Sequence, residues 1–426
     1  MKFDEFGFDS RLLEGIKVNS FETATPIQEQ TIPAILAGKD ILASAQTGTG
    51  KTAAFLLPVI HKIQTLHHDK HIKALVIVPT RELAMQIDQH MEGLSYFTEV
   101  SSIAVYGGTD GAAFTREKQA LTEGADMVIC TPGRMIAHLN QGYVKLANLK
   151  FLILDEADRM RDMGFYDDIM KILSYLPAKR QNLLFSATMP SKIRVMARKV
   201  LQDPVEINIA TTTPVEKIVQ EAYIVYDKQK IPLVTHLLHA KKLKSILIFC
   251  STKSATKQLS LELKKAHFGA EAIHSDLDQD VRENVLSRFK SRDLNILVAT
   301  DILSRGIDIE NIDLVINFDV PHDGEDYIHR IGRTARAESE GIAITLVNEK
   351  EQRKFSRIEE LLGKSVAKIQ VPAQFGVAPE FSPGKMAKSP GISRFNKARS
   401  KKPLNIGTRT PSHRSSGSRP NRTGNK

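Results

Sequence analysis

Short, nearly continuous apolar runs alternate along the chain with longer segments that have helical periodicity. Strands that are apolar at every position are typical of parallel sheets covered by helices on both faces. The runs of the first half are 40–44, 74–79, 103–106, 127–130, 151–154 and 182–186, and those of the second half are 222–226, 245–250, 272–273, 295–299, 314–318 and 342–347. Two such series predict two tandem α/β domains with parallel sheets.

The pattern also predicts where the domains begin and end. The stretch Ile209–Lys217, which contains Ala-Thr-Thr-Thr-Pro-Val, interrupts the alternation of strands and helices. Clusters of Thr and Pro between periodic segments are typical of linkers. We therefore predict a first domain at 1–208, a linker at 209–217, a second domain at 218–370 and a C-terminal tail at 371–426.

Composition places the chain among globular proteins of the cytoplasm. Of its 426 residues, 42% are hydrophobic and 25% charged, which excludes collagen-like and mostly disordered classes. We find no apolar run of about 18 residues that would predict a membrane span, and acids stand near the start where a signal peptide is apolar. Cys130 and Cys250 offer neither paired ligand spacing nor a disulfide framework.

Charge is concentrated at the C-terminal end. From Lys385 to Lys426 there are 12 Lys or Arg and no acid, whereas the whole chain has 59 bases and 49 acids. The remainder is therefore nearly neutral. A basic tail rich in Ser, Pro, Gly and Asn is expected to be disordered and to attract a polyanion. The alternative is a solubilising tail without a partner.

A phosphate-binding loop follows the first apolar run. The sequence Ala45-Gln46-Thr47-Gly48-Thr49-Gly50-Lys51-Thr52 separates this strand from a helical pattern. Glycines let backbone N–H groups surround phosphates, a Lys reaches the outer phosphates and a Thr hydroxyl binds Mg²⁺. The usual pattern has Gly where this chain has Ala45, and a glycine-rich helix start without a ligand is the alternative.

An acidic pair after the 151–154 strand completes a nucleotide site. Ligands of open α/β sheets bind at the carboxyl ends of the strands, where Asp155-Glu156-Ala157-Asp158 stands. Asp155 is suited to hold Mg²⁺, and Glu156 to position and deprotonate a water that attacks the γ-phosphate. A solvated acidic loop is the alternative. Together with the loop upstream, the acids predict a nucleoside triphosphatase.

These motifs, in this order and spacing, resemble those of the DEAD-box ATP-dependent RNA helicases, and most closely the compact bacterial ones of the RhlE type. The resemblance covers about residues 1–370 and implies two RecA-like domains of helicase superfamily 2, with ATP and Mg²⁺ as cofactors. It implies that Gln28 of Thr25-Pro26-Ile27-Gln28 reads adenine and that Phe3 stacks on it. Helix start and core packing are the alternatives for these two residues.

The resemblance also implies roles for residues that couple ATP to RNA. Ser186 and Thr188 match the coupling motif, whose hydroxyls are expected to bond to the Asp155–Asp158 loop, and a plain turn after a strand is the alternative. Asp308 matches the residue that reaches the ATP ribose. Arg333 and Arg336 match the arginine fingers, so Lys51, Asp155, Glu156, Arg333 and Arg336 form the expected catalytic set. The expected contacts to the RNA backbone are Thr80, Arg81, Gly108, Thr131, Arg134, Thr252, Arg282 and Thr300.

The expected activity is RNA-stimulated ATP hydrolysis coupled to local opening of RNA without sequence preference. The expected partners are single-stranded and structured RNA, with ribosomal or RNA-decay assemblies among the candidates, and no membrane. We expect a monomer. Two alternatives stay open, namely a related ATPase that acts on DNA and an ATP-gated RNA clamp or chaperone whose output is binding.

Deletion of residues 385–426 tests the role of the basic tail. We expect weaker RNA affinity and a shallower dependence of this affinity on salt, because fewer counterions are released on binding. ATP affinity should not change. RNA titrations at several salt concentrations measure both quantities, and an unaltered salt slope would refute the tethering role.

Overall fold

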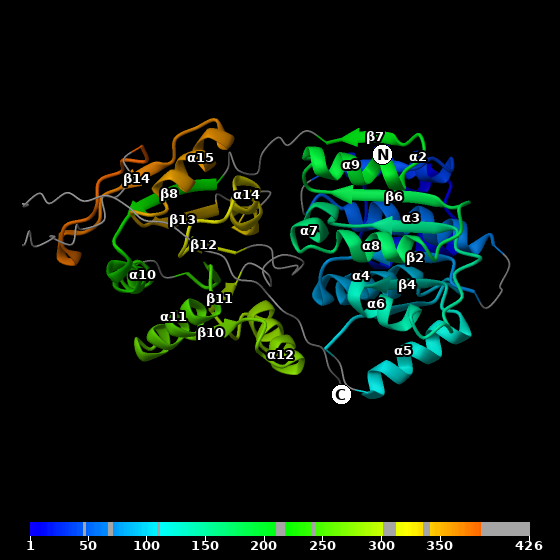
Figure 1. Ribbon diagram of the computed structural model, residues 1–426, viewed down its shortest axis with the longest axis horizontal. Helices are drawn as coiled ribbons and strands as arrows, with labels where there is room; N and C mark the ends of the chain where they lie inside the picture. The colour runs from blue at the N-terminus through cyan, green and yellow to red at the C-terminus, as the bar shows by residue number, and fades with distance from the viewer. Residues whose placement is uncertain are drawn as a thin grey trace, which may run out of the picture. The chain divides into compact units, whose positions relative to one another are not determined.

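The computed structural model of the chain describes residues 1–45, 48–66, 71–108, 111–209, 218–240, 243–300, 312–334 and 341–384 (Figure 1). Met1–Lys385 form one compact unit that contains two parallel sheets. We call residues 1–209 lobe one and residues 218–384 lobe two. The predicted two-domain α/β architecture is confirmed.

Lobe one is built on a sheet of seven strands among the described residues, and all of its neighbouring strands are parallel. Consecutive residues of a strand face opposite sides, so Leu42 packs into one core while Ile41 and Ala43 pack into the other. Both faces are therefore apolar, as the runs in the sequence predict. The strand order is β3 (Ser102–Val105), β4 (Met127–Cys130), β2 (Ala74–Ile77), β5 (Phe151–Leu154), β6 (Gln181–Ser186), β1 (Ile41–Ser44) and β7 (Val205–Asn208).

Helices cover both faces of this sheet. The first core cluster holds side chains of four helices, α1 (Ser10–Val18), α2 (Pro26–Leu36), α3 (Lys51–Gln64) and α4 (Arg81–Ser95). The second holds side chains of five, α5 (Gly111–Glu123), α6 (Pro132–Leu139), α7 (Ala157–Asp162), α8 (Tyr166–Leu173) and α9 (Ser191–Val200). A short 3₁₀ helix, η1 (Phe3–Phe6), precedes α1.

Lobe two repeats this architecture. Its parallel strands have the order β10 (Ala270–Ile273), β11 (Ile296–Thr300), β9 (Ile246–Cys250), β12 (Leu314–Asn317), β13 (Gly341–Val347), β8 (Ile218–Ile224) and β14 (Ala367–Ile369). Its helices are α10 (Asp227–Ala240), α11 (Lys253–Lys265), α12 (Gln279–Lys290), α14 (Gly324–Ile331) and α15 (Gln352–Leu362), with 3₁₀ turns η3 (Gly332–Thr334) and η4 (Ala373–Phe375). They pack in three clusters on the sheet.

Each predicted apolar run overlaps a strand, with ends that differ by up to four residues, but the sequence missed the edge strands β7 and β14. In β7 only Ile207 is buried, and β14 has three residues, none of them buried. An edge strand that faces solvent has no need of a continuous apolar run. The start of β8 at Ile218 was also missed, because its first residues alternate between buried and exposed.

The packed part of lobe two extends beyond the predicted boundary at residue 370. Val371 is buried, and Phe381 packs in the cluster of α14 and α15. The Gln352 side chain donates to the Glu380 carbonyl at 2.8 Å and accepts from the Ser382 N–H at 2.6 Å. Residues 371–384, which we assigned to the tail, therefore belong to the lobe, and the rest of the tail lies outside the described residues.

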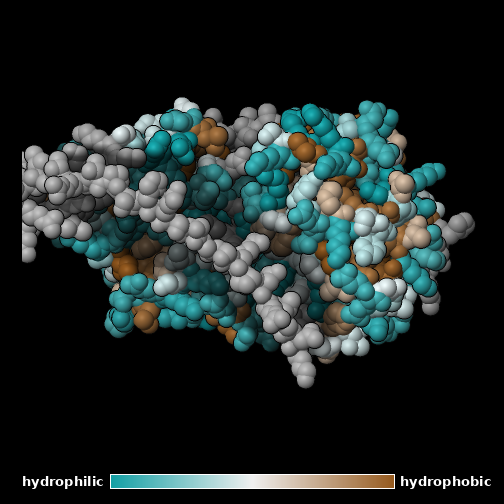
Figure 2. Space-filling model, in the orientation of Figure 1, coloured by the Kyte–Doolittle hydropathy of each residue, from teal (hydrophilic) through white to brown (hydrophobic). Residues whose placement is uncertain are grey.

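The surface carries both hydrophobic and hydrophilic side chains. In the face drawn in Figure 2, hydrophobic patches are interspersed among hydrophilic side chains. No helix in the described ranges is both long and apolar enough to cross a membrane.

A close helix contact in lobe one can be tested with Gly15→Ala. A Cβ at Gly15 of α1 would fall on the Leu94 carbonyl oxygen of α4, far inside van der Waals distance. Because backbone must move, we expect a loss of about 1–3 kcal/mol in unfolding free energy and a Tm lower by a few degrees. Gly111→Ala is the matched control, since nothing lies within 4 Å of that Cβ. Equal Tm values for both variants would contradict the helix contact.

Candidate nucleotide and nucleic-acid site

The predicted nucleotide residues gather at the carboxyl edge of sheet one. Strand β6 lies between β1 and β5, and all three run parallel. The register places Ser44 opposite Ser186, and Leu154 opposite Leu184. The phosphate loop, the acidic pair and the coupling motif, which follow these strand ends, are therefore neighbours.

The phosphate loop is hydrogen-bonded to β6, and its lysine side chain is hydrogen-bonded to the first residue of the loop. The Ala45 N–H donates to the Ser186 carbonyl at 3.1 Å, and Lys51 Nζ donates to the Ala45 carbonyl at 2.7 Å. Gly50 has φ +90°, and a Cβ there would also lie 2.5 Å from Gln28 Nε2. Glycine is thus needed just before α3, whose N-terminus favours anions.

Gln28 is tied to the phosphate loop in this structure. Its Oε1 accepts from the Thr25 N–H at 2.9 Å, which caps α2, and its Nε2 donates to the Gly50 carbonyl at 3.1 Å. Gln28 therefore takes part in the start of α2, as the alternative interpretation predicts. Recognition of adenine by Gln28 stays a prediction. Phe3 is only 3% exposed and packs in the first core cluster, which realises the core alternative for this residue.

The acidic pair is buried beside Lys51. Burial raises the pKa of Asp155, and the Lys51 charge opposes this rise. Burial, followed by the Asp155 charge, raises the pKa of Glu156 to about 7 against the attraction of Lys51 and Arg333. A glutamate with a pKa near 7 is suited to take and return a proton at neutral pH.

The donors at this edge fit the expected Mg²⁺. The Thr52 hydroxyl and the Asp155 carboxylate are oxygen ligands of the kind that Mg²⁺ prefers, and it is usually bound by one or two carboxylates together with substrate phosphates. Glu156 Oε2 is buried without a hydrogen-bond partner among the described residues. Within these residues no three His, Cys, Asp or Glu side chains form a metal cluster, and the expected site is completed by phosphate oxygens and water.

The coupling motif binds the acidic loop directly. Asp158 Oδ2 accepts from the Thr188 N–H at 3.0 Å and from its hydroxyl at 2.9 Å. The Asp158 N–H donates to Ser186 Oγ at 3.2 Å. The expected contact is present, while its role in coupling stays a prediction. Asp158 itself was not among our site residues, although its place in the Asp-Glu-Ala-Asp motif was the available signal.

The predicted RNA contacts of lobe one follow strands of the other half of the same edge. Thr80 and Thr131 are the N-caps of α4 and α6, so both stand at helix N-termini that favour phosphate. Gly108 has φ +84°, and a Cβ there would collide with the Arg81 guanidinium, which lies across it. Arg134 Nε donates to Glu117 Oε2 at 2.6 Å.

In lobe two, Thr252 repeats the arrangement of Thr80. Its hydroxyl accepts from the Ala255 N–H at 3.1 Å and caps α11. Thr300 ends the neighbouring strand β11. Arg282 donates to Gln279 Oε1 at 3.2 Å and forms an ion pair with Glu82.

The remaining predicted site residues are described only in part. Arg333 is buried in η3. The predicted residues Gln46, Thr47, Asp308 and Arg336 lie outside the described residues.

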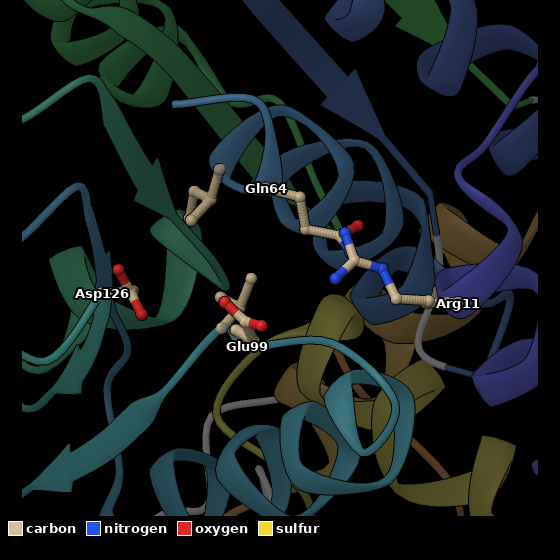
Figure 3. Close-up of a pocket in the computed structure, with 6 residues that line it drawn as sticks. Arg11, Gln64, Glu99 and Asp126 are labelled. Atoms are coloured by element: carbon tan, nitrogen blue, oxygen red, sulfur yellow. The ribbon is translucent and has the colours of Figure 1, made fainter. Parts of the chain in front are cut away.

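A second polar pocket in lobe one is too small for a nucleotide. Arg11, Gln64, Glu99 and Asp126 line it (Figure 3), and its volume of about 10 Å³ holds roughly one water molecule. Gln64 ends α3, whereas the phosphate loop precedes the first residue of that helix. At 1.5 Å per residue the two sites are about 20 Å apart.

Two parallel-sheet lobes with a phosphate loop and buried acids define a nucleotide-hydrolysing α/β protein. The sequence model of the DEAD/DEAH box helicase family matches residues 25–196, and that of the helicase conserved C-terminal domain matches residues 229–338. The ATP-dependent RNA helicase CshA of Listeria monocytogenes is 43% identical over 87% of this chain and 71% of its own length. The chain belongs to the DEAD/DEAH box helicase family.

Solved structures give the same result for the fold. A Saccharomyces cerevisiae Dbp5 structure with RNA and ADP BeF3 matches with a TM-score of 0.78 and 29% identity over 87% of this chain and 95% of that chain. A DEAD box protein of Methanococcus jannaschii is 38% identical over 87% of this chain and 99% of that chain, with a TM-score of 0.51. The predicted RecA-like fold of both lobes is confirmed.

The raised pKa of Glu156 predicts how Glu156→Gln changes stability with pH. The folded protein holds the Glu156 proton up to about pH 7, whereas the unfolded chain loses it near the ordinary value of 4.5. The protonated Glu156 therefore contributes its whole share to the unfolding free energy of the wild type below pH 4.5. This share is lost as the pH rises through 7. We expect the unfolding free energy of Glu156→Gln to exceed that of the wild type by an amount that grows across this pH window to about 3 kcal/mol.

Thermal unfolding of both proteins from pH 5 to 8.5, without nucleotide and with a chelator, measures this difference. Glu99→Gln, at the small pocket of Figure 3, controls for the loss of a carboxylate elsewhere in lobe one. A difference between wild type and Glu156→Gln that does not vary with pH would contradict the raised pKa.

Proposed function

We propose that this chain uses ATP to hold RNA and open it locally. As a DEAD-box ATP-dependent RNA helicase it is an RNA-dependent ATPase. The observation that carries the assignment to this site is the burial of Asp155 and Glu156 beside Lys51 at the end of β5, next to the phosphate loop. Groups of this kind hold a triphosphate and activate water.

Within the ATP site, each residue has a distinct proposed role. Lys51 leaves the Ala45 carbonyl and binds the outer phosphates, and Glu156 orients the attacking water and takes its proton. Bound Mg²⁺, held by Thr52 and Asp155, would neutralise phosphate charge. Arg333 and Arg336 act as arginine fingers that stabilise charge in the transition state.

The remaining predicted contacts are proposed to complete the ATP site. Gln28 faces adenine and Asp308 the ribose, whereas Phe3 is packed in the first core cluster and is not proposed to stack on the base. Backbone N–H groups of the phosphate loop bind the phosphates. These residues are proposed from their match to the family motifs.

RNA is proposed to bind at the other half of the strand edge. Thr80, Arg81, Gly108, Thr131 and Arg134 offer hydroxyls, backbone groups and guanidinium groups for phosphate and sugar. Thr252, Arg282 and Thr300 would do the same in lobe two. The support is the position of these residues at strand ends and helix N-termini, together with the family match. The Dbp5 neighbour is bound to RNA and ADP BeF3, and a structure of Mss116p is bound to ssRNA and AMP-PNP.

Coupling is proposed to run through Asp158. Nucleotide at the acidic loop would shift Asp158 and, through its bonds to Ser186 and Thr188, bias closure of the lobes around RNA. A clamped strand is incompatible with a regular duplex, so short helices open, and hydrolysis releases the RNA. An ATP-gated RNA clamp or chaperone is the second candidate function, since it needs the same residues.

We infer the compact bacterial RhlE-like branch, a cytoplasmic location and a monomer. The branch rests on the resemblance of the sequence motifs. The location rests on the RNA substrate and on two buried single thiols, Cys130 and Cys250. Structured RNA of ribosomal or RNA-decay assemblies is the proposed substrate class.

Steady-state ATP hydrolysis with single-stranded RNA, with DNA of the same sequence and without nucleic acid tests the function. We expect stimulation by RNA only, since 2′-hydroxyl contacts distinguish the two polymers. Glu156→Gln should lower the stimulated rate at least about 100-fold, because the general base is lost. Equal stimulation by DNA would overturn the polymer assignment, and no stimulation would overturn the coupling.

A further inference from the structure

A polar and aromatic network, in which Glu117 and His138 are buried and the aromatic rings half-buried, surrounds Arg134, and the ATP site does not use it. It consists of Phe114 and Glu117 of α5, His138 of α6 and Tyr143 of the loop after α6. We call these four residues the Arg134 shell. No motif in the sequence pointed to any of them.

The carboxylate of Glu117 is the centre of the Arg134 shell. Its side chain is 6% exposed, and its Oε2 accepts from Arg134 Nε at 2.6 Å and lies 2.7 Å from His138 Nε2. Charge-assisted hydrogen bonds to a buried carboxylate are short and directional. Glu117 therefore fixes the inner side of the guanidinium.

His138 is held in turn by hydrogen bonds at both ring nitrogens. Its Nε2 faces Glu117, and its Nδ1 contacts the Tyr143 hydroxyl. A neutral ring satisfies both contacts when Nε2–H donates to Glu117 and the Tyr143 hydroxyl donates to Nδ1. Because the ring is fully buried, rotation would break both hydrogen bonds.

The ring of Phe114 contacts both His138 and the guanidinium of Arg134. Its ring stacks on His138 with centroids 4.3 Å apart and planes 14° apart. Arg134 Cζ lies 4.5 Å from the Phe114 centroid, within the range of a cation–π interaction. The guanidinium is thus fixed by an ion pair and by stacking.

The Arg134 shell lies among the proposed RNA contacts of lobe one. Arg134 follows Thr131, the N-cap of α6. Its charge helps burial to lower the pKa of Arg81, so the two guanidinium groups are electrostatic neighbours. An arginine side chain has many rotamers in solution and loses conformational entropy when it is fixed. A guanidinium immobilised before RNA arrives loses less of this entropy on binding.

We propose that Phe114, Glu117 and His138 are positioning residues for RNA, which act by holding Arg134 in one orientation. They set RNA affinity through Arg134 and have no contact with ATP. This inference rests on the proposed function and on the assignment of Arg134 to the RNA backbone.

Phe114→Leu tests the proposal without any change of charge. We expect the Kd for single-stranded RNA, measured by fluorescence anisotropy with a non-hydrolysable ATP analogue, to rise roughly three- to tenfold. Phe114→Tyr keeps the ring and should restore wild-type affinity. Phe97→Leu, a half-exposed phenylalanine after α4 in the same lobe, is the matched control and should leave the Kd unchanged.

A double-mutant cycle with Arg134→Gln separates positioning from a general loss of structure. If Phe114 acts through Arg134, the Phe114→Leu effect disappears in the Arg134→Gln background. An equal effect in both backgrounds, or no effect of Arg134→Gln itself, would overturn the proposal. Tm is measured for every variant, and the Phe114→Tyr rescue applies even where Phe114→Leu is unstable.

Glu117→Gln gives an independent test through the sign of its effect. Removal of a negative charge beside RNA would by itself tighten binding, whereas loss of positioning weakens it. We expect weaker binding, and tighter binding would overturn the proposal. Wild type is assayed first. Failure of RNA to bind or to stimulate it refutes the proposed function, whereas unaltered variants of a stimulated wild type refute only the positioning role.

Discussion

The structure depends on one constraint, which is that parallel strands bring all of their carboxyl ends to a single edge of the sheet. In lobe one the order of the strands divides that edge. Strands β5, β6 and β1 present the acids, the coupling motif and the phosphate loop, whereas β3, β4 and β2 lead into the proposed RNA contacts. The halves meet where β2 pairs with β5, and there the Asp155 N–H donates to the Ile77 carbonyl at 3.1 Å. The ends of the two proposed sites therefore lie on adjacent strands.

The two carboxyl groups of the acidic pair lie at that edge in an environment that disfavours their charged forms. Two carboxyl groups are buried together, and burial outweighs the attraction of Lys51, since both pKa values rise. Glu156 also has φ +50°, a left-handed conformation that costs a non-glycine residue of the order of 1 kcal/mol. Strain of this kind persists only where surrounding contacts fix the backbone. Here the contacts are those of Asp158 with Ser186 and Thr188, so the loop that holds the acids is fixed by the motif that is proposed to couple ATP to RNA.

The sequence predicted both sheets, and it pointed to the phosphate loop and the acidic pair, because these signals are local. An apolar run, a glycine loop and an acid at a strand end can be found without knowledge of distant partners. Edge strands such as β7 were missed because they bury one residue in four. The link of Gln28 to Gly50 and that of Glu117 to His138 join residues more than 20 positions apart. Such contacts follow from packing of helices, which no periodicity in either segment encodes.

The two lobes have the same local structure at their proposed RNA contacts, and its chemistry would explain the lack of sequence preference in the proposed activity. Thr80 and Thr252 each follow a strand, cap a long helix and accept one backbone N–H through the hydroxyl oxygen. The hydroxyl hydrogen is not used in that bond, so each threonine retains a donor, and each helix adds the positive end of its dipole. Donors and dipoles of this kind recognise phosphate and sugar but not base edges. Any preference for a particular RNA must therefore come from outside this edge, and the basic segment 385–426, whose charge is itself indifferent to sequence, would supply affinity rather than choice.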